Sequence, residues 1–377
     1  MTKQARGERP IRLAFIGNTG NILFQRWVNF FARRGHEVTV LDGFGFGRSP
    51  ALDERIRYVA YDARGRWRLP LLPTLHARRT LRRILRDLRP DVLHAHSVKR
   101  YGWQAGVAGW HPYVISTWGS DVLLPPESLQ GRVWDRLTLS RASLVTAVSA
   151  VMRDAAIRRG ARPDRVQQVH FGVDTRRFTP ATVAPDLVRA LGIDERPYVF
   201  SPRAVRPLYN HETVAAAFAR LGTGVQLVVS GRNADPATLR AIRDILAGEG
   251  ALERLRVVGD ASDDQMLALF RAAAVVVSVP LSDSFPITLL EAMACGTPIV
   301  AGDLPAVRAG LVDLVPEWIV STTDVDEVAG ALMRGVHLSA DERGQLGTRL
   351  RDRALESDQE VHMLRMEALY RGLVRAS

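Results

Sequence analysis

Short apolar runs alternate with amphipathic stretches along most of the chain. The run from Ile11 to Ile16 ends in a glycine-containing turn, residues 17–21, and is followed by a stretch to Arg34 with apolar residues at helical spacing. His36 to Leu41 is again apolar. This order of strand, glycine turn, helix and strand is typical of the start of a Rossmann-like domain.

The same pattern predicts two groups of strands, separated by a less regular stretch at residues 175–196. The predicted strands cover residues 92–94, 113–117, 144–148, 198–201, 225–230, 255–258, 274–279 and 298–301. We therefore expect an α/β protein of two Rossmann-like, doubly wound domains. Residues 1–180 form the first domain and 181–355 the second, and a terminal helix at 356–377 can pack back on the first. Ligands of such sheets bind outside the carboxyl ends of the strands, so we expect a site in a cleft between facing domains.

Composition narrows the class of protein. The chain has 377 residues, of which 46% are hydrophobic and 24% charged, as in ordinary globular proteins. Its single cysteine, Cys295, excludes an intrachain disulfide framework and a cysteine-based zinc site. No apolar run approaches the length of a membrane span, and no signal-peptide pattern is visible. We therefore expect a soluble cytoplasmic protein.

The net charge of +11 is unevenly distributed. Residues 1–180 hold 31 Lys and Arg against 14 Asp and Glu, a net +17, and the remainder holds 20 against 26, a net −6. This asymmetry suggests that the first half faces an anionic partner: nucleic acid, a membrane surface or a phosphorylated substrate. A general preference for arginine codons would give the same excess.

A basic amphipathic stretch precedes the strand at Val92. Leucines and Ile84 recur at helical spacing, and the positions between them carry the arginines Arg78, Arg79, Arg82, Arg83, Arg86 and Arg89. Such a helix can lie on an anionic membrane face. We favour an outer Rossmann helix whose leucines face the sheet, because the strand "DVLHAH" follows directly. Both interpretations hold if only the arginines touch lipid headgroups.

The segment from Asp283 to Pro298 has the most specific pattern. A polar loop with Asp283 follows an apolar strand, and a helix then runs from about Ile287 with Glu291 in it. Loop amides and a helix N-terminus can bind an anion, and the two carboxylates can bind sugar and ribose hydroxyls. The alternative is that Asp283 is a helix-start acid and Glu291 a half-buried helix residue.

This segment resembles the Glu-x7-Glu motif of retaining glycosyltransferases of the GT-B fold, especially those of family 4 (glycosyl transferases group 1). Flanking "LLEAMACGTPIV" is also similar, as are "DVLHAHS", "VISTWGSDVLL", "TAVSAVMRD", "VHFGVDTRRFTP" and "VVSGR". The resemblance covers about residues 11 to 335.

The resemblance implies roles for particular residues. Asp283, Arg203 and Arg206 would act at the transferred sugar and the diphosphate. Glu291 would bind the donor ribose. The remaining implied donor-binding residues are Gly17, Gly231, Gly259, Phe285, Pro286, Ile287 and Thr288. On the acceptor side we expect His96, Trp118 and Asp121.

Three positions depart from the family pattern. Asp283 replaces the usual Glu, and Trp118 replaces a His that many members have. Leu208 stands where a Lys is usual, so Arg206 is the nearest cation that could neutralise the leaving diphosphate.

We expect no metal. His94 and His96 offer two ligands without a visible third, which favours a strand-end or pocket role. Asp121 can contact an acceptor or cap the helix that follows it.

The resemblance implies transfer of a sugar from a nucleotide-diphosphate sugar to a glycan or lipid-linked acceptor, in cell-surface polysaccharide or glycolipid synthesis. No cofactor is expected besides this donor substrate, and a peripheral contact with the inner face of the cell membrane fits the basic half. A sugar-nucleotide epimerase of the same fold is the alternative. A non-enzymatic nucleic-acid-binding protein is more remote, because no reading motif or basic stripe with stacking aromatics is visible.

Overall fold

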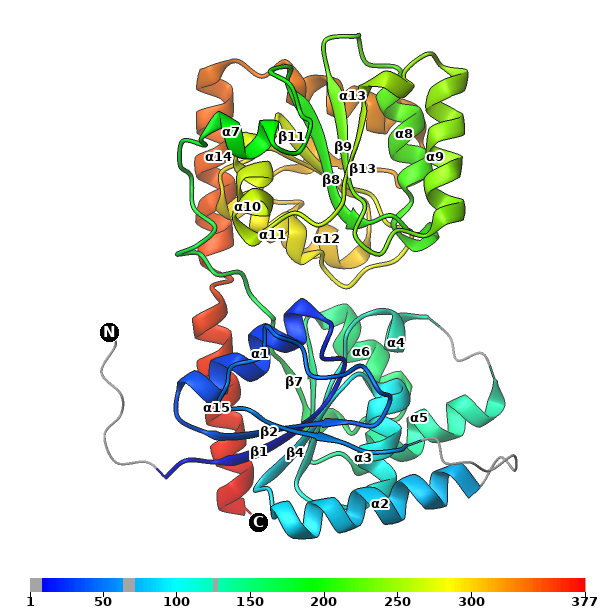
Figure 1. The fold of residues 1–377 in the computed structure, drawn as a ribbon, viewed down its shortest axis with the longest axis vertical. Coiled ribbons are helices and arrows are strands. Elements are labelled where there is room, and N and C mark those ends of the chain that lie inside the picture. Colours follow the sequence, from blue (N-terminus) through cyan, green and yellow to red (C-terminus); the bar gives the residue numbers. More distant parts are fainter. Residues whose placement is uncertain (1–8, 64–71, 125–127, 377) are drawn as a thin grey trace. The chain divides into compact units, whose positions relative to one another are not determined.

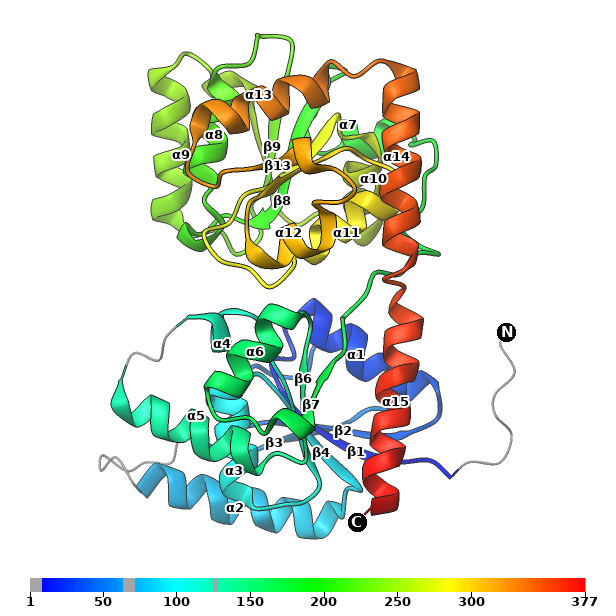
Figure 2. The ribbon, with the colours of Figure 1, turned by 180° about the vertical axis from the view of Figure 1, so that it is seen from behind.

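The computed structural model describes residues 9–63, 72–124 and 128–376. The chain forms two compact units (Figures 1 and 2). The first ends at Phe171 and takes up the chain again from His362, and the second spans Gly172–Val361. The expected boundary at residue 180 thus lies inside the second unit.

A parallel sheet forms the centre of the first unit, with the strand order β3-β2-β1-β4-β5-β6-β7. Its strands are β1 (Arg12–Ile16), β2 (Glu37–Asp42), β3 (Arg57–Ala60), β4 (Val92–His96), β5 (Tyr113–Ser116), β6 (Leu144–Ala147) and β7 (Val166–Gln168). The five strands that the apolar runs predicted in this half are confirmed. Edge strands β3 and β7 were not predicted.

Helices cover this sheet. They are α1 (Ile22–Arg33), α2 (Leu72–Leu88), α3 (Trp103–Ala108), α4 (Ser120–Leu123), α5 (Leu129–Arg141), α6 (Ala150–Arg158) and the terminal α15 (Gln359–Ala376). Helix α1 begins where the Asn21 side chain accepts hydrogen bonds from two backbone amides, and its buried face includes Trp27 and Phe31. The turn of residues 17–21 is therefore a strand-to-helix connection, as its sequence predicted.

The terminal helix completes the core of the first unit. Tyr370 of α15 is fully buried, and its hydroxyl lies 2.5 Å from Nδ1 of His94 and accepts a hydrogen bond from the Trp27 indole. Glu367, one turn earlier, accepts hydrogen bonds from Arg34 at 2.6 Å and Arg371 at 2.9 Å. Burial alone would raise the pKa of Glu367, but these two arginines lower it. Residues at the end of the chain therefore stabilise its beginning.

The second unit contains another parallel sheet, with the order β10-β9-β8-β11-β12-β13. Its strands are β8 (Tyr198–Ala204), β9 (Gln226–Ser230), β10 (Leu255–Val258), β11 (Val275–Ser278), β12 (Ile299–Gly302) and β13 (Ile319–Val320). Its helices are α7 (Pro185–Arg189), α8 (His211–Ala219), α9 (Pro236–Gly248), α10 (Asp263–Ala272), α11 (Ile287–Ala294), α12 (Pro305–Leu311), α13 (Val325–Val336) and α14 (Ala340–Leu355). The two predicted Rossmann-like domains are confirmed.

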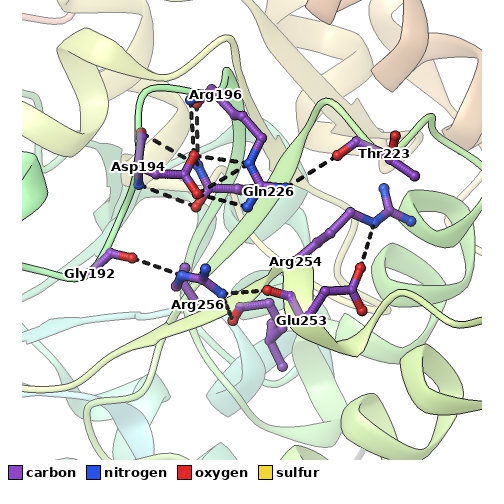
Figure 3. A network of polar contacts seen from close by, with 9 residues as sticks. Gly192, Asp194, Arg196, Thr223, Gln226, Glu253, Arg254 and Arg256 are labelled. Carbon is purple, nitrogen blue, oxygen red and sulfur yellow. Dashed lines mark hydrogen bonds and ion pairs between the residues drawn. The ribbon is translucent and has the colours of Figure 1, made fainter.

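A polar network holds the amino ends of β8, β9 and β10 together (Figure 3). The Asp194 carboxylate pairs with Arg196 at 2.7 Å and accepts a hydrogen bond from the fully buried amide of Gln226 at 2.8 Å. The hydrogen bond from Arg196 lowers the pKa of Asp194 to about 2. The side chains at the amino edge of this sheet thus bind one another. Ligand-binding side chains are therefore to be sought at the carboxyl edge.

We expect Tyr370→Ala to lower the free energy of unfolding by about 3–5 kcal/mol, because it removes a buried aromatic ring and two hydrogen bonds. Leu364→Ala, at a 39% exposed position of the same helix, is the matched control and should cost less than about 0.5 kcal/mol. Urea unfolding followed by circular dichroism measures both. Equal effects would contradict the assignment of α15 to the core.

Candidate functional site

The predicted donor residues lie along the carboxyl edge of the second sheet. Arg203 is at the end of β8, and Gly231, Gly259 and Asp283 follow β9, β10 and β11. These four strands are neighbours in the order β10-β9-β8-β11. The parallel sheet therefore gathers residues that are up to 80 positions apart in sequence.

An ion pair forms at the middle of this edge. Nη2 of Arg203 lies 2.9 Å from Oδ2 of Asp283, and both side chains are less than one-fifth exposed. The Arg203 guanidinium also stacks over the ring of Tyr209, 4.1 Å from its centroid. The stacked ring fixes the plane of the guanidinium, whose remaining N–H groups can still donate to an anion.

Helix α11 begins four residues after Asp283. Its N-cap residue is Pro286, and no side chain caps it among the described residues. The hydroxyl of Thr288 in its first turn is buried and has no hydrogen-bond partner among those residues. An uncapped helix start carries free amides and a partial positive charge, which suit an anionic group. Phe285, Pro286, Ile287 and Thr288 thus lie together, as the resemblance implied.

Glu291 lies on the second turn of α11, where its residue is only 7% exposed. Glu291 is therefore buried rather than half-buried, and its role toward ribose stays a prediction. Gly231 and Gly259 differ from each other. A Cβ at Gly231 would lie 2.7 Å from Val257, whereas Gly259 faces open space.

Leu208, which stands where the family usually has a lysine, lies in the loop after β8. The Leu208 carbonyl accepts a hydrogen bond from the Leu281 amide at 3.0 Å, so this residue ties two loops together. Asn210 adopts a left-handed conformation with φ of 55° and donates to the carbonyls of Val279 and Thr322. Arg206 is exposed, and its charge adds to the Thr238 hydrogen bonds in lowering the pKa of Asp235.

Two neighbours of Arg203 were missed from the sequence. Tyr209 stacks on the guanidinium, and His211 at the start of α8 is 1% exposed. Burial lowers the pKa of His211 to about 4, although the backbone of Arg203 partly opposes this. The signal that could have found them is their position in the loop directly after the strand that carries Arg203.

Gly17 in the first unit has a packing reason to be glycine. It follows β1, and a Cβ there would overlap the ring of Phe24 on α1. The predicted approach to a sugar phosphate stays a prediction.

His94 and His96 lie in the core of the first unit. His94 bonds Tyr370 and, through Nε2, Ser116 at 2.8 Å, so its two ring nitrogens are occupied. His96 is 2% exposed and lies among aromatic rings, with centroids 5.0 Å away for Phe24 and 5.7 Å for Trp118. Burial lowers the pKa of His96 to about 3, which keeps it neutral. His96 is thus the last residue of β4, and its acceptor-side role stays a prediction.

Asp121 organises two loops. Its carboxylate accepts hydrogen bonds of 2.9 Å from the amides of Trp118, Gly119 and Val98, and the residue is 6% exposed. These contacts join the loop after β5 to the loop after β4. Both carboxylate oxygens are therefore engaged by backbone amides that precede α4. Asp121 does not cap this helix, because it lies in the first turn and Gly119 is the N-cap. A contact to an acceptor stays a prediction.

Most arginines of α2 are exposed to solvent. Arg78, Arg79, Arg83 and Arg86 are exposed, whereas Leu81 and Leu85 are fully buried. Arg82 is half-buried and donates to the Ala108 carbonyl. The leucines thus face the unit, as the outer-helix interpretation expects. In the described part of the chain, every helix is too short or too polar to cross a bilayer.

Solved structures define the class of fold. A glycosyltransferase from Rickettsia africae matches with a TM-score of 0.81 and 14% identity, over 98% of this chain and 100% of that one. Anabaena Alr3699/HepE, solved in complex with UDP and glucose, matches with a TM-score of 0.80 and 16% identity, over 96% of this chain and 100% of that one. The fold is that of the GT-B glycosyltransferases.

Sequence comparison gives the family. The family model for glycosyl transferase 4-like proteins matches residues 12–149, and the model for glycosyl transferases group 1 matches residues 185–353. The chain belongs to the group 1 glycosyltransferases.

One curated relative matches about half of the chain. The D-inositol 3-phosphate glycosyltransferase of Mycobacterium tuberculosis is 33% identical over 196 residues, which are 50% of this chain and 40% of the relative. The chain thus matches less than half of that relative's length.

We expect stability to fall as the pH is lowered from about 6.5, the value at which an unfolded histidine titrates. The folded pKa is about 3 for His96 and about 4 for His211, so the unfolded chain binds more protons in this window. Each such histidine then removes up to about 1.4 kcal/mol per pH unit. Urea unfolding at pH 7 and pH 5 should show a smaller loss for His96→Asn than for wild type. The exposed His337→Asn is the control, and identical losses in all three proteins would contradict the prediction.

Proposed function

We propose that the protein transfers a sugar from a nucleotide-diphosphate sugar to a glycan or lipid-linked acceptor, with retention of the anomeric configuration. The observation that supports this best is the Arg203–Asp283 pair beside the uncapped start of α11. A guanidinium, free helix amides and a carboxylate are the groups needed to bind a diphosphate and the hydroxyls of the sugar attached to it.

Each group has a distinct part in the proposal. Arg203 offers several N–H donors, so it can bind phosphate oxygens while it keeps Asp283 in place. Asp283 accepts hydrogen bonds from a sugar hydroxyl, and the amide of Ile287 with the Thr288 hydroxyl meets the diphosphate. Glu291 binds the ribose. Because Leu208 carries no charge, Arg203 and the exposed Arg206 supply the positive charge that stabilises the leaving group.

The chemistry needs no protein nucleophile in this proposal. The acceptor hydroxyl attacks from the face that the diphosphate leaves, and a diphosphate oxygen takes its proton. The protein contributes positioning and stabilisation of an oxocarbenium-like transition state. No group of three potential metal ligands occurs among the described residues, and the proposal assigns no residue to a metal.

We expect Glu291→Ala and Asp283→Asn to lower kcat/KM for sugar transfer by about 100-fold or more, because each removes a contact to the donor. Release of nucleotide diphosphate from a panel of nucleotide sugars, with and without acceptor, measures this. Glu249→Ala, an exposed carboxylate after α9, is the control. Wild-type activity in all three variants would contradict the site, and isomerised donor without acceptor would favour an epimerase.

We also propose a peripheral contact with the inner face of the cell membrane. The exposed arginines of α2 support it, and α5 adds apolar side chains. Leu129 is 75% exposed, Val133 57% and Leu137 39%, spaced one helical turn apart. Arg132 and Arg136, on the same helix, are exposed as well. Exposed apolar residues next to arginines suit a surface of anionic lipids.

Sedimentation with lipid vesicles tests this contact. We expect binding to vesicles with phosphatidylglycerol and much weaker binding to pure phosphatidylcholine. Leu129→Ser with Val133→Ser should weaken the binding by at least about tenfold, because the apolar insertion is lost. Leu252→Ser with Val361→Ser, at 42% and 62% exposed positions of the second unit, is the control. Unchanged binding of the α5 variant would remove this helix from the proposal.

A further inference from the structure

A cavity of about 370 Å³ lies within the first unit, and neither His94 nor His96 is among its described lining residues. It is bordered by the loops after β2, β3 and β4, by α2 and α3, and by the first half of α5. Its walls include the aromatic residues Phe44, Trp103 and Trp134, the polar residues Gln104, Ser128 and Gln130, and Arg100. The volume is in the range of small-molecule sites, about 300–1,000 Å³.

Buried polar contacts hold the aromatic walls in place. Asp42, 1% exposed, accepts hydrogen bonds from the amides of Phe44, Gly45 and Gly47 and so fixes the loop that carries Phe44. The Trp103 indole donates to the buried Asp135 at 3.0 Å. These walls are therefore preorganised, which lowers the cost of ordering them around a ligand.

The loop that carries Arg100 is strained. Ser97 has φ of 108° and Arg100 has φ of 57°, and neither is glycine. Such conformations cost about 1–3 kcal/mol each and persist where the surrounding structure demands them. Arg100 is exposed, so its side chain is accessible at the rim of the cavity.

The lining defines the chemistry of a ligand. Among its described residues Arg100 carries the one charge and no carboxylate is present, which favours an anionic group. The flat aromatic faces suit the apolar face of a ring, and the amide and hydroxyl side chains can bind ring hydroxyls. Neither a purely apolar ligand nor a cation fits this combination.

We propose that this cavity binds the acceptor of the transfer, as a polyhydroxylated ring that carries an anionic group. The role as acceptor site rests on the proposed function, whereas the binding itself does not. The ring can belong to a soluble molecule, such as a sugar phosphate or a uronic acid, or to the headgroup of a lipid. Both sources present the same chemistry to Arg100 and the aromatic walls.

Calorimetric titration of the full chain tests the binding. The probes are glucose 6-phosphate and glucuronate for a free ring, phosphatidylinositol vesicles for a lipid headgroup, and glucose as the neutral comparison. We expect at least one anionic probe to bind about tenfold or more tightly than glucose. Saturation by a soluble probe identifies a free source. Saturation by phosphatidylinositol vesicles alone identifies a lipid source, provided that phosphatidylglycerol vesicles of the same charge bind more weakly, because the exposed residues of α2 and α5 would bind both alike.

Two variants locate the bound probe. Arg100→Gln removes the charge, and Val107→Trp fills the cavity from α3. Each should weaken the best anionic probe by about tenfold or more, whereas Arg240→Gln at an exposed position of α9 in the second unit should not. Binding of nucleotide sugar should be unchanged in all three variants.

The outcomes separate this inference from the proposed function. If no probe binds, or if Arg100→Gln and Val107→Trp bind it like wild type, the cavity is not the site. If the probe binds as expected but no sugar is transferred from any donor, the binding site stands and the proposed function fails.

Discussion

The parallel pairing of β8 with β9 and with β11 is the constraint on which the donor-side arrangement depends. It brings the end of β8, with Arg203, next to the end of β11, from which the chain continues to Asp283. Without that pairing the two side chains would have no reason to meet, and α11 would not begin beside a guanidinium. The amino edge of the same strands is closed by Asp194, Arg196 and Gln226. The sheet therefore divides stabilising contacts and binding groups between its two edges.

The sequence predicted the central strands because each is a continuous apolar run that is buried on both faces. Strands β3, β7 and β13 escaped prediction because they are short edge strands, and their pairing rather than their composition defines them. Likewise, Arg203 and Asp283 could be anticipated as residues that follow strands. The stacking of Tyr209 on Arg203 could not, because it depends on how the intervening loop folds.

In the first unit, the sequence indicated where polar residues lie but not what their side chains contact. His96 and Asp121 stood out as polar residues near strand ends, yet the fold buries one among aromatic rings and uses the other to join two loops. The cavity has no local signature, because Phe44, the segment from Arg100 to Trp103, and Trp134 are far apart in sequence and only the fold brings them together. A polar residue near a strand end can therefore be placed at the carboxyl edge of the sheet from the sequence. Only its contacts in the folded protein show whether its side chain is available to bind a ligand.

The course of the chain has a consequence for synthesis on the ribosome. The second unit is one uninterrupted segment, and its ends meet where the Gln359 amide donates to the Val173 carbonyl at 2.9 Å. It can therefore fold as soon as it has emerged. The first unit is begun earlier but lacks Tyr370 until the whole second unit has been made, so Trp27 and Phe31 have an incomplete core in the meantime. Of these two units, the one that is begun first is thus completed after the other.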